Sequence, residues 1–134
     1  IINTVRQNFD YTVLDLTPIL DDNTIATVEQ ADYIWFITNP EISTLKNSKV
    51  CMSILQDLSL EQKIRIVLNK DSDASIKQNN VCKVLGTGIE LASPYDYATA
   101  VTAVNRGKPF VLSAPRSKAS KSFEQYAKTH DELT

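Results

Sequence analysis

Short apolar runs alternate with helical patterns along most of this 134-residue chain, and this alternation restricts its fold more than any other feature. Runs that are short and almost continuously apolar are typical of strands covered on both faces. Strands separated by helices favour a parallel sheet with right-handed crossovers. The sequence therefore predicts an α/β fold, a parallel sheet flanked by helices, with strands at 11–14, 33–37, 64–68, 89–92 and 110–112.

Local signals indicate where the helices begin and end. Asn39, Pro40 and Glu41 supply a cap, a first-turn proline and a first-turn acid for one helix. Asp96 is the expected cap of another, which Gly107 ends. Weaker patterns predict helices at 21–30 and 76–85 and a polar helix at 117–130. In the helix that follows Asn39, the spacing of apolar residues predicts a buried face made of Cys51, Ile54, Leu55 and Leu58.

Composition excludes several classes of protein. Hydrophobic residues make up 43% and charged residues 22% of the chain, which is close to the average for globular domains. The net charge of −2 argues against a protein that coats nucleic acid. No apolar run approaches the roughly 20 residues of a membrane span, and no signal peptide opens the chain. We therefore expect a single cytoplasmic domain, 1–134, with no nucleic-acid partner and no membrane insertion.

The two cysteines, Cys51 and Cys82, lie inside apolar helical patterns. With one histidine in the chain and no C-x-x-C motif, a zinc site is not expected. The cysteines are interpreted as reduced core thiols, with a disulfide between them as the alternative.

Polar residues follow the predicted strands, where ligands bind in parallel sheets. Asp15 and Thr17 follow the first strand, Asn69 the third, and Pro94 and Asp96 the fourth. A carboxylate there can hold magnesium or its water shell near a phosphate, and an asparagine can hydrogen-bond a planar base. Each residue alone is equally compatible with turn formation, so the order of the segments carries more information than any one of them.

That order resembles the MinD/ParA family of deviant-Walker P-loop ATPases, and most closely its pilus-assembly branch of the CpaE/TadZ type. The similarity runs from about Asn8 to the last helix and covers the C-terminal half of that family's domain. It thus implies part of a Rossmann-like, three-layer P-loop NTPase fold. The matching stretches are 9–18, 31–40, 43–47, 66–70, 93–96 and 103–109.

The resemblance implies a role for each of these polar residues. Asp15 matches the Walker B acid that orders the magnesium shell, and Thr17 belongs to the switch segment after it. Asn69 matches the asparagine that recognises adenine, while Pro94 and Asp96 match the segment on the other side of the base. ATP and magnesium are thus the implied ligands of a longer protein, which would position or assemble a pilus or secretion machine at a cell pole or pilus site.

One departure from the family is decisive for activity. The Gly-rich loop ending in Lys-Ser/Thr, which cradles the phosphates, does not occur among the three glycines Gly86, Gly88 and Gly107. We therefore expect this chain alone to hydrolyse no ATP and to carry no bound cofactor. The chain also lacks the P-loop strand that is central in the family's sheet, so some strand edges should be left unpaired. We therefore expect the chain to form a homodimer. The resemblance further implies contacts of the longer protein with pilus or secretion proteins.

Two alternatives to a partial ATPase remain open. One is a non-catalytic scaffold that keeps the fold and recruits partners through its surface. The other is a phosphorelay receiver-like domain, with Asp15 as phosphoacceptor and Lys70 as the distal lysine. The receiver is disfavoured because its acidic pair needs an earlier strand, and only Ile1 to Asp10 precede the first one.

Overall fold

The computed structural model describes residues 2–73 and 76–130. The chain divides into two compact units, Ile1–Ala31 and Asp32–Thr134. The first unit contains helices α1 (Ile2–Arg6) and α2 (Asp22–Gln30), joined by a segment without regular secondary structure. The second unit contains the sheet and the remaining helices.

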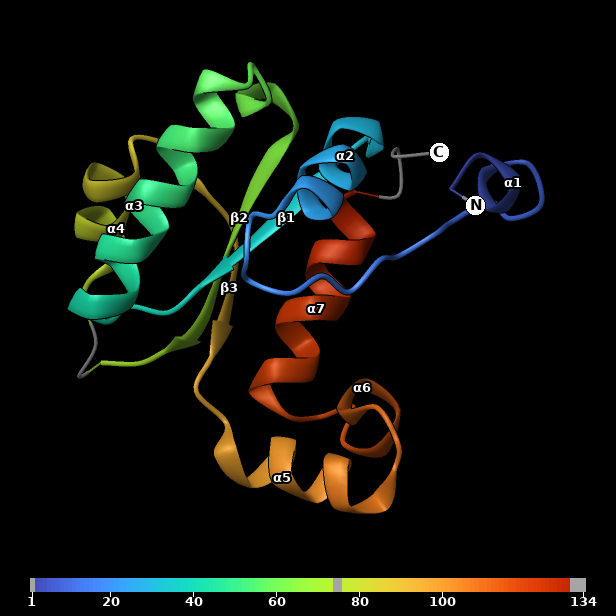
Figure 1. The fold of residues 1–134 in the computed structure, drawn as a ribbon. Coiled ribbons are helices and arrows are strands. Elements are labelled where there is room, and N and C mark those ends of the chain that lie inside the picture. The colour runs from blue at the N-terminus through green and yellow to red at the C-terminus, as the bar shows by residue number, and fades with distance from the viewer. Residues whose placement is uncertain (1, 74–75, 131–134) are drawn as a thin grey trace. The chain divides into compact units, whose positions relative to one another are not determined.

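The described part of the second unit is built on a parallel sheet in the order β1-β2-β3. Its strands are β1 (Ile34–Thr38), β2 (Ile64–Asp71) and β3 (Ile89–Pro94). Helices α3 (Ile42–Asp57) and α4 (Gln78–Leu85) cover one face of the sheet, and α7 (Lys118–Thr129) covers the other (Figure 1). Between β3 and α7 lie α5 (Tyr97–Arg106) and the short α6 (Phe110–Ser113), and η1 (Glu61–Lys63) precedes β2. The predicted α/β fold with a helix-flanked parallel sheet is confirmed.

The core lies on the side of the sheet that α3 and α4 cover. Ile66 and Leu68 of β2 and Val81 of α4 expose 1%, 0% and 0% of their surface. Alternate residues of β2 point to one face of the sheet, so Ile64, Ile66 and Leu68 all enter this core. The hydroxyls of Thr38 and Ser48 lie 2.7 Å apart and are buried, which satisfies both polar groups where α3 crosses β1.

Most helix ends follow the sequence signals, but the predicted cap at Asn39 is wrong. Helix α3 begins at Ile42, and Glu41 stands at the cap position without a side-chain hydrogen bond, so Asn39, Pro40 and Glu41 all precede the helix. The carboxylates of Asp21 and Asp96 accept the backbone N–H groups of Thr24 and Thr99, and the Ser117 hydroxyl accepts that of Ser120. Gly107 ends α5 in the left-handed conformation, with φ +61°. The predicted cap at Asp96 and stop at Gly107 are thus both confirmed.

Two of the predicted strands are wrong. Segment 11–14 belongs to the first unit, where no described strand pairs with it, and a strand needs a partner for its backbone hydrogen bonds. Segment 110–112 forms α6 instead. There the N–H of Ser113 reaches the carbonyl of Pro109, and the Phe110 ring packs edge-on against Phe123 at a centroid distance of 5.5 Å.

The predicted buried face of α3 is wrong in part. Leu55 is buried, but Cys51 is only half-buried, and Ile54 and Leu58 are exposed. The face turned inward is rotated by about one residue from the predicted one, and on this face Ser48 pairs with Thr38. Its buried members are Leu45, Ser48, Met52 and Leu55.

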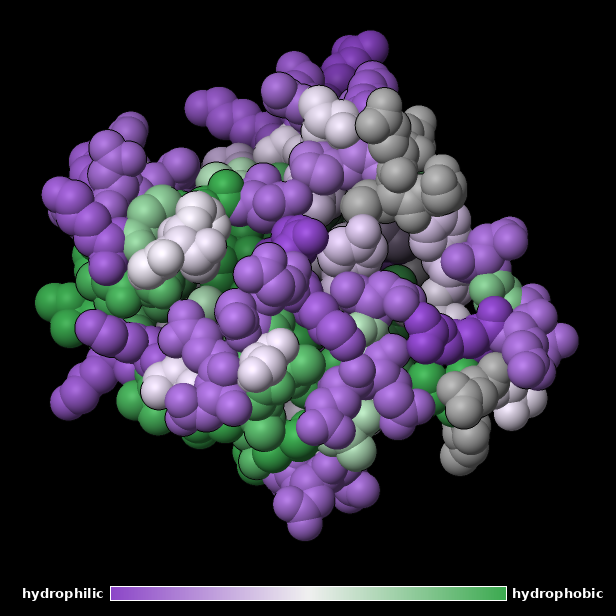
Figure 2. All heavy atoms as spheres, turned by 90° about the horizontal axis from the view of Figure 1, so that it is seen from above, coloured by the Kyte–Doolittle hydropathy of each residue, from purple (hydrophilic) through white to green (hydrophobic). Residues whose placement is uncertain are grey.

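Hydrophobic side chains also reach the surface. In Figure 2 they form separate patches among a majority of hydrophilic residues. Trp35 and Ile37 of β1 expose 52% and 66% of their surface.

Within the described residues, no helix is both long and apolar enough to cross a membrane.

Candidate functional site

A small hollow lies beyond the carboxyl ends of β2 and β3, with a cavity volume of about 140 Å³. This is the edge at which parallel sheets bind ligands. Complete small-molecule sites usually measure about 300–1,000 Å³, so the hollow suits one ring system of a ligand rather than a whole nucleotide. Its walls are formed by Asn69, Lys70, Ser93, Pro94, Tyr95, Asp96, Tyr97, Thr99, Ala100, Phe110 and Ala119.

The end of β2 is irregular at the hollow. The pairing of β2 with β3 shifts between Leu68 and Asp71, so that β2 uses one residue more than its partner. Lys70 adopts a φ of +58° within this shift. Beyond the shift the strands pair again, and the Tyr95 N–H donates to the Asp71 carbonyl at 2.8 Å. The hollow is therefore built on a fixed strand end.

Asp96 is positioned by its role as a helix cap. Its Oδ1 accepts the Thr99 N–H at 3.2 Å at the start of α5. A carboxylate held in this way satisfies one of the free donors of the helix end and has oxygen acceptor capacity left over. Pro94, the last residue of β3, stands beside it in the wall.

The opposite wall comes from α6 and α7. Phe110 and Ala119 are its members. The Ser120 hydroxyl links the two helices, lying 2.7 Å from the carbonyl oxygen of Ala114 and 3.1 Å from that of Phe110. The hollow thus combines an apolar wall with polar groups at the strand ends, which suits a flat, partly polar ring.

The structure brings together three of the predicted site residues, because Asn69, Pro94 and Asp96 all line the hollow. Asp15 and Thr17 belong to the other unit, where both are exposed and lie outside regular secondary structure. No group of three or more His, Cys, Asp or Glu side chains suited to a metal ion occurs in the described part of the chain.

The sequence indicated no binding role for four further residues that line the hollow, although two of them stand in the strand-end segments: Lys70, Tyr95, Tyr97 and Phe110. Two tyrosines that flank the Asp96 cap directly after a strand were a usable signal for the first wall. Phe110 was missed because its segment was predicted to be a strand. The left-handed conformation at position 70 was not predictable either, because glycine or asparagine would signal it and the residue there is a lysine.

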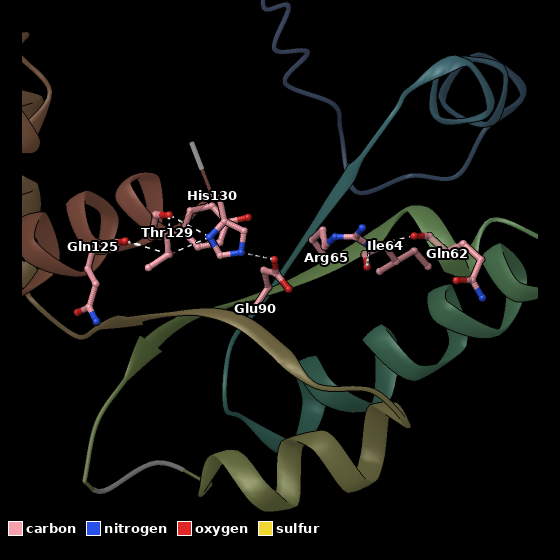
Figure 3. Close-up of polar contacts among 8 residues, drawn as sticks. Gln62, Ile64, Arg65, Glu90, Gln125, Thr129 and His130 are labelled. Atoms are coloured by element: carbon pink, nitrogen blue, oxygen red, sulfur yellow. Dashed lines mark hydrogen bonds and ion pairs between the residues drawn. The ribbon is translucent and has the colours of Figure 1, made fainter. Parts of the chain in front are cut away.

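A second polar cluster lies on the α7 face of the sheet (Figure 3). His130 and Glu90 point toward each other, with 2.9 Å between Nε2 and Oε1. The His130 ring stacks on Tyr126 at 4.1 Å, and Tyr126 meets Trp35 edge-on at 6.3 Å. Burial raises the pKa of the Tyr126 phenol, and the Glu90 carboxylate raises it further. This cluster fastens the end of α7 to the sheet.

The fold with its helix-flanked parallel sheet matches that of solved ParA and MinD ATPases. The ParA family ATPase from Chlorobium tepidum matches it with a TM-score of 0.88 at 22% identity, over 95% of this chain and 53% of that one. The MinC:MinD complex of Aquifex aeolicus matches with 0.86 at 19% identity, over 99% and 57%. MinD of Pyrococcus horikoshii, solved with Mg-ADP, matches with 0.82 at 23% identity, over 98% and 54%.

The relatives that share sequence similarity with the chain include MinD proteins. The septum site-determining protein MinD of Oltmannsiellopsis viridis is 25% identical over 129 residues, which are 92% of this chain and 40% of that protein. The chloroplastic MinD homolog of Arabidopsis thaliana is 26% identical over 124 residues, or 88% and 37%. No family model matches the chain. The chain spans less than half the length of these relatives, and the similarities together support a relationship to the MinD/ParA-type ATPases.

Proposed function

We propose that this chain is the base-binding, C-terminal half of a MinD/ParA-like ATPase domain. The observation that carries the proposal is the convergence of Asn69, Pro94 and Asp96 on one hollow at the carboxyl ends of β2 and β3. The asparagine amide offers both a donor and an acceptor, which matches the edge of a purine, and the Phe110 wall offers an apolar surface for the ring.

The described residues fit the base of a nucleotide but not its phosphates. A triphosphate needs backbone N–H groups and a lysine to balance its charge. Gly86 and Gly107 are both used as left-handed helix ends, and Gly88 leads into β3, so none of the three glycines forms a phosphate loop. In a longer protein that supplies the loop, Asp15 would serve the magnesium shell and Thr17 the switch segment.

Base recognition is tested with Asn69→Ala in the protein extended upstream to include a phosphate loop. ATP binding should weaken about tenfold relative to GTP, because one hydrogen bond to the base edge carries the discrimination. Asn79→Ala, an exposed asparagine on α4, is the matched control and should leave the preference unchanged. An ATP/GTP preference that survives Asn69→Ala would refute the role of Asn69.

The 134-residue chain itself should show no ATPase activity above that of its Asp15→Ala variant. Phosphate release by the purified chain is the measurement. Robust turnover that depends on Asp15 would contradict the proposal, since it would require a phosphate cradle that the sequence does not contain.

For the longer protein we propose a role in positioning or assembling a pilus or secretion machine from the cytoplasm, as a homodimer recruited to a cell pole or pilus site. The MinD relatives of this chain are named septum site-determining proteins, and this supports a positioning role. The pilus assignment rests on the segments that resemble the pilus-assembly branch. Co-purification with pilus rather than septum proteins is the test.

A non-catalytic scaffold that keeps the fold and recruits partners through its surface is the second candidate. The two candidates differ in nucleotide binding by the longer protein. ATP binding at micromolar concentration supports the ATPase, whereas partner recruitment without any nucleotide binding supports the scaffold.

A further inference from the structure

The backbone at Lys70 is in a conformation that lysine rarely adopts. Its φ of +58° lies in the left-handed region, where a side chain is strained. Among the described residues, Ser59 is the other non-glycine residue with positive φ, and it lies in the turn after α3, away from the hollow. Strain of this kind persists only where the surrounding structure holds it.

The strained residue coincides with the extra residue of β2. Leu68 pairs with Ala92 and Asp71 pairs with Pro94, so two residues of β2, Asn69 and Lys70, oppose the single residue Ser93. This is the arrangement of a β-bulge, which bends a strand and changes the direction of its side chains.

The bulge lies at the residues of β2 that border the hollow. In a regular strand, neighbouring side chains point to opposite faces of the sheet, so Asn69 and Lys70 would be separated. Asn69 and Lys70 both border the hollow, as does the consecutive run 93–97 at the neighbouring strand end. Lys70 would otherwise follow Leu68 toward the α3 and α4 side of the sheet.

We propose that Lys70 is a positioning residue of this hollow, and that its left-handed backbone rather than its ammonium group holds Asn69 and the strand end in place. The inference rests on the proposed function in taking the hollow as the site for the base. It adds that the geometry of base recognition is set by one backbone conformation next to the recognising amide.

The test compares substitutions that separate backbone from charge. Lys70→Gly favours the left-handed conformation and removes the charge, Lys70→Met removes the charge alone, and Lys70→Val disfavours the conformation through its branched Cβ. Ser59→Val is the matched control, since it places the same branched residue at the other left-handed position, outside the hollow.

The probe is adenosine, which needs no phosphate cradle, titrated into the 134-residue chain at millimolar concentration. Amide NMR signals of Asn69, Tyr95 and Thr99 report on the hollow, and thermal unfolding reports on stability. Lys70→Gly and Lys70→Met should keep the signals and adenosine binding. Lys70→Val should shift the signals, weaken binding about fivefold or more and lower Tm by roughly 3–6 °C. Ser59→Val should lower Tm similarly while leaving the signals of the hollow in place.

Two results would overturn the proposal. Equal loss of binding in Lys70→Gly, Lys70→Met and Lys70→Val would assign the role to the ammonium group. Unchanged signals in Lys70→Val would show that the backbone at this position does not shape the hollow. A third result separates the two proposals. If the wild-type chain does not bind adenosine, but the ligand-free signals and Tm values of the Lys70 variants follow the expected pattern, then the base-binding function is refuted and the positioning role of Lys70 is supported.

Discussion

The imidazole Nε2 of His130 lies 2.9 Å from Oε1 of Glu90, so the residue that follows α7 is tied directly to β3. The same ring stacks on Tyr126, one helical turn earlier, and Tyr126 contacts Trp35 of β1. These contacts span the sheet from β3 to β1. They hold the far end of the helix whose first turn supplies Ala119 to the hollow.

The Tyr126 phenol should titrate at higher pH than an ordinary tyrosine, because burial and the Glu90 charge both raise its pKa above 10.0. Glu90→Gln should lower that pKa part of the way back. Since the folded state holds the phenol proton more strongly, the stabilisation is complete below pH 10 and is lost as the pH rises above it. Ultraviolet absorbance titration measures this, and Tyr126→Phe identifies the signal among the five tyrosines. A Tyr126 titration that Glu90→Gln leaves in place would contradict the charge effect.

Leu68→Ala should destabilise the fold by about 2–5 kcal/mol, because it opens a cavity in the most tightly enclosed part of the core. Leu68 exposes 0% of its surface, whereas Val104 exposes 79% and is the matched control. Val104→Ala should change the free energy of unfolding by less than about 0.5 kcal/mol. Chemical denaturation of both variants provides the comparison, and equal losses would show that Leu68 is not in the core.

Gly107→Ala should destabilise the fold by about 1–2 kcal/mol, because alanine is strained at the left-handed end of α5. A Cβ at this position would meet no atom within 4 Å, so the cost comes from the backbone alone. Gly88→Ala, which meets equally open space at a glycine without positive φ, should cost less. Thermal unfolding distinguishes the two variants, and identical Tm values would exclude the backbone explanation.

The purified chain should sediment as a dimer at micromolar concentration without nucleotide. Within the described residues β1 pairs with β2 alone, and Ile37 beside this open edge is 66% exposed. Unpaired strand edges and exposed apolar side chains favour association. Ile37→Lys should shift the chain toward monomer, whereas Leu112→Lys on α6, at a residue 76% exposed, should not. A well-folded wild-type monomer would refute the edge-pairing hypothesis.

The sequence predicted the three paired strands and most helices correctly, because periodicity and capping are local signals. Asp96 and Gly107 mark both ends of α5 through chemistry that involves a few neighbouring residues. Segments 11–14 and 110–112 failed because an apolar run becomes a strand only if another strand is available to pair with it.

The candidate site was predictable in part for the same reason. Asn69, Pro94 and Asp96 follow strands, and the parallel topology brings the ends of neighbouring strands together. The left-handed backbone of Lys70 and the place of Phe110 could not be predicted, since they depend on a bulge and on the packing of α6 against α7. Neither feature leaves a pattern of residue types along the chain.

The strand order β1-β2-β3 follows the order of the chain, with α3 and then α4 between successive strands. Among the described residues, each strand of this sheet therefore pairs with its immediate predecessor or successor in the sequence. Such a sheet can be lengthened at either side by adding a whole strand–helix unit, without rethreading any existing connection.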